Sequence, residues 1–266
     1  MRFGVSSPNV GIDPASLVDL AVDAEKAGWD GVFVWDAIFG INPWVALTAM
    51  AVRTERVRLG PLVTPMARRR PWTLAGETAS LDRLAKGRLI LPVGLGAEEQ
   101  NWTKVGEEES NRLKAKRLDE GLAILTGLWT GEAFSYAGEI FQVKDVTLDV
   151  KPAQLPRIPI WVSGGWPNPP GTQRRRMLRW DGVLCGPDVD FRSLRAYLDA
   201  NRESATPYDL ITEGDTPGDD PGRAVGVVRP LSDASVTWWL EGVWRKMDTP
   251  EGLAGMRQRI QQGPPR

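Results

Sequence analysis

Histidine is absent from this chain of 266 residues, and cysteine occurs only once. Without His, the sequence lacks the commonest general base and the commonest ligand of transition metals. Ser-His-Asp triads, Cys-His dyads and His-liganded zinc sites are therefore excluded. A single Cys also excludes an intrachain disulfide and a Cys-cluster metal site, so no metal site is predicted. Any acid–base chemistry falls to carboxylates, Tyr, Lys or a bound cofactor.

The sequence also lacks an excess of charge of either sign and any long apolar run. Its 33 Lys+Arg and 34 Asp+Glu give a formal net charge of -1. This balance argues against a nucleic-acid partner and against a polybasic membrane patch. There is no run of about 18 apolar residues, and the first residues do not have the pattern of a signal peptide. We therefore expect a cytoplasmic protein whose partner is a small molecule.

Short apolar runs rich in Val, Ile and Leu alternate with stretches of helical period. The predicted strands are 2–6, 31–36, 56–63, 88–94, 158–163, 181–185, 208–213 and 235–241. Apolar strands that alternate with helices indicate an α/β fold with a parallel sheet covered by helices. Eight such units in about 250 residues fit a closed (β/α)₈ TIM barrel. An open doubly wound sheet is the alternative, but the first strand–helix turn has no G-x-G-x-x-G pattern.

Local signals place several helix starts and one insertion. Asp13-Pro14 and Asn42-Pro43 each read as an N-cap followed by Pro in the first turn, and Thr216-Pro217 reads the same way for the seventh helix. The segment 132–143, EAFSYAGEIFQV, predicts a small hairpin inserted after the fourth helix. No long linker interrupts the pattern, so residues 1–266 are predicted to form a single domain.

The site of such a barrel lies at the carboxyl ends of its strands. Ser163-Gly164-Gly165 follows the fifth strand and precedes a helix, where glycines allow close backbone approach and free N–H groups attract a phosphate. An ordinary tight turn explains the same residues equally well. Gly94 and Gly96, after the fourth strand, are a second point of close approach.

Aromatic and basic residues at these strand ends suggest what the site binds. Together, five tryptophans favour an apolar pocket for a flat ring, although each alone is better explained as core: Trp35, Trp102, Trp166, Trp238 and Trp239. The basic run 68–70 follows a strand, and it either binds an anion or forms a solvated face. The basic run 174–176 is interpreted as a solvated face. Cys185 is interpreted as a small core residue, because no His activates it.

Four stretches resemble the luciferase-like monooxygenases, a family of flavin-dependent oxidoreductases. They are AEKAGWDGVFVWD (24–36), residues 42–89, RLDEGLAILTGLW (117–129) and residues 158–182. The resemblance implies a TIM barrel that binds FMN or coenzyme F420 at its mouth and that reduces or monooxygenates a small organic substrate. It also implies a bulge or a non-prolyl cis peptide in the third strand, and phosphate contacts in the turn after the fifth. The expected cofactor-binding residues are Leu62, Val63, Thr64, Gly94, Gly96, Ser163, Gly164, Gly165 and Trp166. The oligomeric state is open, with a homodimer as the candidate because homodimers are common among relatives.

One departure from the family pattern affects the chemistry. The second strand commonly ends in Asp-His in this family, whereas this sequence has Asp36-Ala37. The candidate catalytic carboxylates are Asp36, Glu98 and Glu213, with Glu241 as a further substitute; alternatively, hydride transfer by the cofactor needs no protein base. Two other functions stay open. One is a catalytically silent flavin-binding barrel, and the other is a retaining glycosidase with Glu98 or Glu99 and Glu213 as its carboxylate pair.

Overall fold

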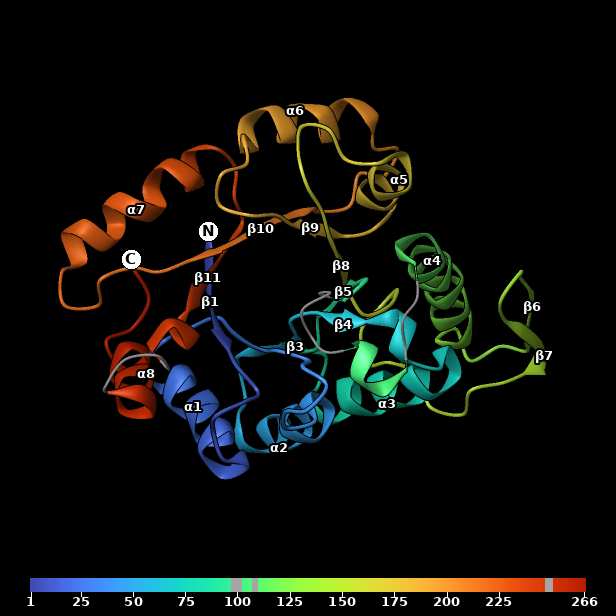
Figure 1. The fold of residues 1–266 in the computed structure, drawn as a ribbon, viewed down its shortest axis with the longest axis horizontal. Helices are drawn as coiled ribbons and strands as arrows, with labels where there is room; N and C mark the ends of the chain where they lie inside the picture. Colours follow the sequence, from blue (N-terminus) through green and yellow to red (C-terminus); the bar gives the residue numbers. More distant parts are fainter. Residues whose placement is uncertain (97–101, 107–109, 247–250) are drawn as a thin grey trace.

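Parallel strands close into a barrel in the computed structural model of the chain, which describes residues 1–96, 102–106, 110–246 and 251–266 (Figure 1). Neighbouring strands pair in parallel throughout this sheet. Their order is β3 (Arg58–Pro61), β2 (Gly31–Val34), β1 (Arg2–Ser7), β11 (Trp238–Gly242), β10 (Asp209–Gly214), β9 (Gly182–Leu184), β8 (Ile160–Ser163), β5 (Leu91–Gly94) and β4 (Thr64–Pro65). The predicted (β/α)₈ barrel is confirmed.

The predicted third strand is present as two pieces, β3 and β4. The first piece closes the barrel because Leu59 bridges Leu89 just before β5. The second piece, β4, pairs with the end of β5 through Thr64 and Pro65. Between them the Leu62–Val63 peptide bond is cis, as the family resemblance implies for this segment. The interruption lies at the carboxyl end of the strand, where the site is expected.

Eight helices within the described ranges cover the outside of the barrel. They are α1 (Pro14–Lys26), α2 (Pro43–Arg53), α3 (Pro71–Leu84), α4 (Asn111–Leu128), α5 (Gly171–Arg179), α6 (Phe191–Asn201), α7 (Pro221–Asp233) and α8 (Gly252–Gln261). Asp13 caps α1 and Asn42 caps α2, as predicted, by accepting hydrogen bonds from backbone N–H groups of the first turn. The predicted cap Thr216-Pro217 is wrong, because α7 begins at Pro221 and is capped by Asp220.

Large aromatic side chains fill the inside of the barrel. The rings of Phe33 and Trp161 stack with centroids 5.3 Å apart, and Trp238 lies 5.4 Å from Trp161. Space for them comes from inward-facing glycine: a Cβ on Gly60 would lie 2.6 Å from the carbonyl oxygen of Ile90 and 3.1 Å from the Phe33 ring. Trp238 is fully buried in this core, and Trp239 is 2% exposed. The expectation that these two tryptophans wall a ligand pocket is therefore wrong.

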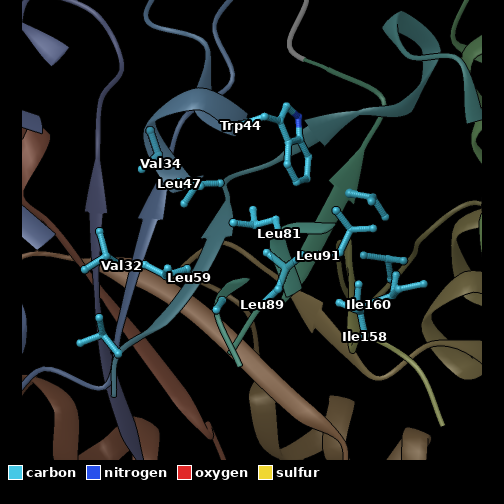
Figure 2. Packing of buried hydrophobic residues seen from close by; sticks show 14 of the residues in the cluster. Val32, Val34, Trp44, Leu47, Leu59, Leu81, Leu89, Leu91, Ile158 and Ile160 are labelled. Atoms are coloured by element: carbon cyan, nitrogen blue, oxygen red, sulfur yellow. The ribbon is translucent and has the colours of Figure 1, made fainter. Parts of the chain in front are cut away.

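A second apolar layer lies between the strands and the helices. Figure 2 shows Val32, Val34, Leu59, Leu91 and Ile160 on the strands, facing Trp44 and Leu47 of α2 and Leu81 of α3. Burying each such side chain contributes roughly 1.5–3 kcal/mol. The two layers fix the strand ends, and with them the positions of the site residues.

The predicted insertion is an antiparallel hairpin of β6 (Phe134–Ala137) and β7 (Gln142–Val146), which projects beside α4 (Figure 1). Glu120 of α4 holds it, because its buried carboxylate accepts hydrogen bonds from the backbone N–H groups of Glu139, Ile140 and Phe141. Among the described residues, no helix combines the length and the apolar character needed to cross a bilayer.

Candidate active site

A cavity of about 750 Å³ opens at the carboxyl ends of β5 and β8, between α4 and α5. We call it the α4–α5 cavity. Its volume is within the range typical of cofactor and small-molecule pockets. The wall nearest the barrel is mostly apolar and is formed by Val63, Val93, Gly94, Leu95, Gly96 and Ser163. Val63, on the carboxyl side of the cis bond, thus meets the ends of β5 and β8.

The structure brings four of the predicted cofactor-binding residues together in this wall: Val63, Gly94, Gly96 and Ser163. Leu62 instead packs against the aromatic core inside the barrel. Thr64 is fully buried in β4, and its hydroxyl has no hydrogen-bond partner among the described residues.

The glycine turn after β8 lies beside the cavity but does not line it. The N–H of Gly164 is already used, since it donates to the carbonyl oxygen of Leu184 at 2.9 Å. Trp166 turns toward α6, where its indole N–H donates to the Ser193 hydroxyl at 2.7 Å. The helix that follows begins only at Gly171, so Gly165 is not directly joined to its N-terminus.

The outer wall of the cavity comes from the first turns of α4 and α5 and is cationic. Arg112 and Lys116 project from α4, and Arg176 projects from α5. Arg176 is held by a bidentate ion pair with Asp119, at 2.6 and 2.9 Å. The N-terminus of α5 also lines the cavity through Thr172, and its N-cap residue makes no side-chain capping bond. This end therefore favours an anionic group.

Sequence reasoning did not select Arg112 or Lys116. Its interpretation of the run 174–176 as a solvated face is wrong for Arg176, which is 6% exposed and paired with Asp119. The signal in the sequence was helical spacing, which places polar residues on one face of a helix. Residues 112, 116 and 119 follow the spacing i, i+4, i+7, and residues 172 and 176 follow the spacing i, i+4. The cavity combines an apolar wall at the barrel with a cationic outer end. Such a combination fits a molecule with a flat ring and an anionic tail, so the residues present suit a flavin or deazaflavin phosphate.

Across the barrel, four side chains form a cluster at the mouth, which we call the mouth cluster: Ser6, Trp35, Glu213 and Trp244. The Trp35 and Trp244 rings lie 5.2 Å apart, and the Trp35 indole N–H donates to the Ser6 hydroxyl at 3.3 Å. The Trp244 indole N–H donates to Glu213 Oε1 at 3.3 Å. Burial raises the pKa of Glu213 above the ordinary range of a glutamate, although hydrogen bonds from Ser6 and Trp244 oppose this. The cluster can therefore hold a proton beside an aromatic surface.

The other candidate carboxylates have different surroundings. Asp36 is buried and pairs with Arg69 at 2.8 Å and with Arg68 at 3.3 Å, so the basic run 68–70 has an internal partner. Glu241 is 1% exposed and pairs with Arg259 at 3.2 Å, while Thr216 and Trp239 donate hydrogen bonds to it.

Glu98 lies outside the described residues, as does Glu99. Cys185 is buried among core side chains, as predicted, and burial raises the pKa of its thiol to about 12. This thiol is therefore not a nucleophile at neutral pH.

This barrel, with its interrupted third strand and its cavity beside β5 and β8, belongs to a known family. Residues 1–209 match the sequence profile of the luciferase-like monooxygenases, and the chain is a member of that family. The resemblance noted in the sequence is thus confirmed over most of the chain.

Individual relatives show what this chain is similar to. It is 31% identical over 259 residues to an F420-dependent glucose-6-phosphate dehydrogenase of Kineococcus radiotolerans, which covers 89% of this chain and 74% of the relative. The chain spans about half the length of several other curated relatives with the same name.

Solved structures show the same fold at low sequence identity. A monooxygenase of Streptomyces bottropensis superimposes with a TM-score of 0.80 and 19% identity, covering 98% of this chain and 97% of the other. A coenzyme F420-dependent tetrahydromethanopterin reductase of Methanopyrus kandleri gives 0.80 and 18%, covering 98% and 96%. Both kinds of enzyme share this fold, so the fold alone does not separate their chemistries.

Proposed function

We propose that the chain is an oxidoreductase that uses FMN or coenzyme F420 to reduce or monooxygenate a small organic substrate. The observation that carries the proposal is the α4–α5 cavity, which joins an apolar wall at the interrupted strand to a cationic outer end. Membership of the luciferase-like family supports the same reading. The flavin or deazaflavin supplies the redox chemistry when bound, and the protein supplies binding, orientation and exclusion of water.

We propose two groups of residues for the cofactor. Val63, Gly94 and Gly96 would contact the ring, and Leu62 and Thr64 would support this wall from the core side. The phosphate would lie at the outer end of the cavity, between the N-terminus of α5 and the side chains of Arg112 and Arg176, and Ser163 would line the cavity between the ring and the phosphate. Gly164, Gly165 and Trp166 would shape the turn beside it.

For the acid–base role we favour Glu213 over the other carboxylates. Its raised pKa allows its carboxyl group to hold a proton nearer to neutral pH than an ordinary glutamate does. Asp36 is engaged by two arginines, which suits a positioning role better than proton transfer. Glu98 stays a candidate. The paired rings of Trp35 and Trp244 favour an apolar substrate, and glucose 6-phosphate is the comparison compound because the relatives are named for it.

The experiment that tests this function is titration of the purified protein with FMN and with coenzyme F420, followed by tryptophan quenching and by calorimetry. We expect saturable binding of at least one of them and turnover of its reduced form with a suitable acceptor. Binding without turnover of any acceptor would favour the catalytically silent alternative. Failure to bind either compound would overturn the proposal, and hydrolysis of a glycoside would support the glycosidase alternative.

We also propose a cytoplasmic homodimer that binds neither nucleic acid nor membranes. The support for a dimer is the outer face of α2, where Val45 and Val52 are 69% and 66% exposed and Trp72 of α3 is 43% exposed. Exposed apolar side chains of this kind become buried when a second copy covers them. Sedimentation of the wild type and of Val45→Lys would test it, because a monomeric wild type excludes the dimer.

A further inference from the structure

A second cavity, of about 550 Å³, continues from the α4–α5 cavity along the outer side of α5. The two share Asp119, Thr172 and Arg176 in their walls, so they adjoin along α5, and we call the two together the path. We call the outer part the arginine groove. Its characteristic lining residues are Arg175, Arg176, Arg179, Trp180 and Asn201. The proposed function uses the inner cavity only.

The walls of the whole path carry more positive than negative charge. Five cations line it, namely Arg112, Lys116, Arg175, Arg176 and Arg179, against two carboxylates, Asp119 and Glu203. Two of the cations are already paired, Arg176 with Asp119 and Lys116 with Glu139 of the hairpin.

Three cations in the path are not in contact with a carboxylate of the described residues, although Glu139 of the hairpin is near enough to Arg112 to interact with its charge. Within the described part of the chain, no carboxylate forms an ion pair with Arg112, Arg175 or Arg179. Since the whole chain has a net charge of -1, this local excess is not a consequence of composition.

Three arginines of the groove and Thr172 lie along one face of α5. Thr172, Arg175, Arg176 and Arg179 follow the i, i+3, i+4, i+7 spacing, so they lie on one face of α5. Thr172 and Arg179 are seven residues apart, about 10 Å along the helix. The guanidinium of Arg179 lies over the ring of Trp180, 5.1 Å from its centroid, which orients that charge in the groove. The path therefore offers successive cationic positions beyond the inner cavity.

This arrangement distinguishes the two candidate cofactors. FMN ends at a single phosphate, whereas coenzyme F420 continues beyond its phosphate into a chain of glutamates, each with a carboxylate. Arginine recognises carboxylates through paired N–H donors. We infer that the arginine groove binds the carboxylates of the F420 tail, so that this chain selects coenzyme F420 over FMN. The inference rests on the proposed function, which leaves the choice between the two open.

Calorimetric titration of the full chain tests the inference without an activity measurement. The ligands are F420 with a long glutamyl tail, F420 with one glutamate, and FMN. The variant is Arg175→Gln/Arg179→Gln, and the control is Arg223→Gln/Arg229→Gln, which removes two exposed arginines of α7 away from the groove. For long-tailed F420 we expect the groove variant to weaken binding about tenfold and added salt to reduce its affinity more than that of FMN. The control should bind all three ligands like the wild type.

The outcomes separate this inference from the proposed function. Equal affinity of the wild type for long-tailed and short-tailed F420, or unchanged affinity in the groove variant, would overturn the inference while cofactor binding itself stands. Equal losses in the groove variant and the control would also overturn it, since they would reflect net charge alone. If FMN binds and F420 does not, the flavin class stands and the selection of F420 is wrong. If neither binds, both proposals fail.

Discussion

Substituting each glycine of the pair after β8 separately tests what the turn does. A Cβ on Gly164 would lie 2.3 Å from Cγ2 of Val183 and 3.4 Å from the sulfur of Met177, whereas one on Gly165 would meet no heavy atom within 4 Å. Overpacking of a well-packed site costs about 1–3 kcal/mol. For a chain of this size, Gly164→Ala should lower Tm by roughly 2–6 °C. Gly165→Ala should leave stability unchanged or raise it by up to about 1 kcal/mol, because the unfolded chain loses freedom.

The same pair separates folding from ligand binding. The N–H of Gly164 is bonded to Leu184, so the turn can offer a phosphate only the backbone around Gly165. In a Gly164→Val variant, a lower cofactor affinity could come either from disturbed packing or from a lost contact with the phosphate. Gly165→Val should leave the fold intact and weaken cofactor binding about tenfold if this turn contacts the phosphate. Calorimetry with the cofactor measures this, beside urea unfolding followed by circular dichroism.

Two results would refute this reasoning. If Gly164→Ala unfolds like the wild type, the close contact with Val183 does not limit the site. If Gly165→Val binds the cofactor as tightly as the wild type, the turn makes no contact with the phosphate, which is then held by the N-terminus of α5 and its neighbouring cations alone.

Two further predictions concern carboxylates. Arg259→Met should lower the free energy of unfolding in urea by about 3–5 kcal/mol, because it leaves Glu241 buried without its cation. The control Arg257→Met removes a half-exposed arginine of the same helix and should cost under about 1 kcal/mol. Equal losses in the two variants would contradict the argument. Because the pKa of Glu213 is raised, turnover that needs its proton should fall as pH rises through that pKa. Glu213→Gln should abolish this fall in the pH–rate profile. A wild-type pH–rate profile in the variant would exclude Glu213 as the proton source.

Local sequence patterns were sufficient to predict the architecture. Alternating apolar runs and helical periods predicted the eight units, and the turn residues of 132–143 predicted the hairpin. These signals are local, since strand and helix periodicities and caps such as Asp13 depend on near neighbours in the chain. The resemblance to the family added the interruption of the third strand. The prediction of a Thr216-Pro217 cap was wrong because Thr216 instead donates hydrogen bonds to Glu241, a residue 25 positions away.

Which residues meet at the site depends on how distant parts of the chain pack. Arg176 and Asp119 are 57 positions apart and form one cavity wall because α4 and α5 face each other across the cavity. The basic run 68–70 was a candidate anion site in the sequence, yet two of its arginines bind Asp36 inside the protein. Trp238 faces the barrel core because closure of the sheet sets which side of each strand points inward. Charge pairing and strand facing depend on distant partners, which periodicity does not encode.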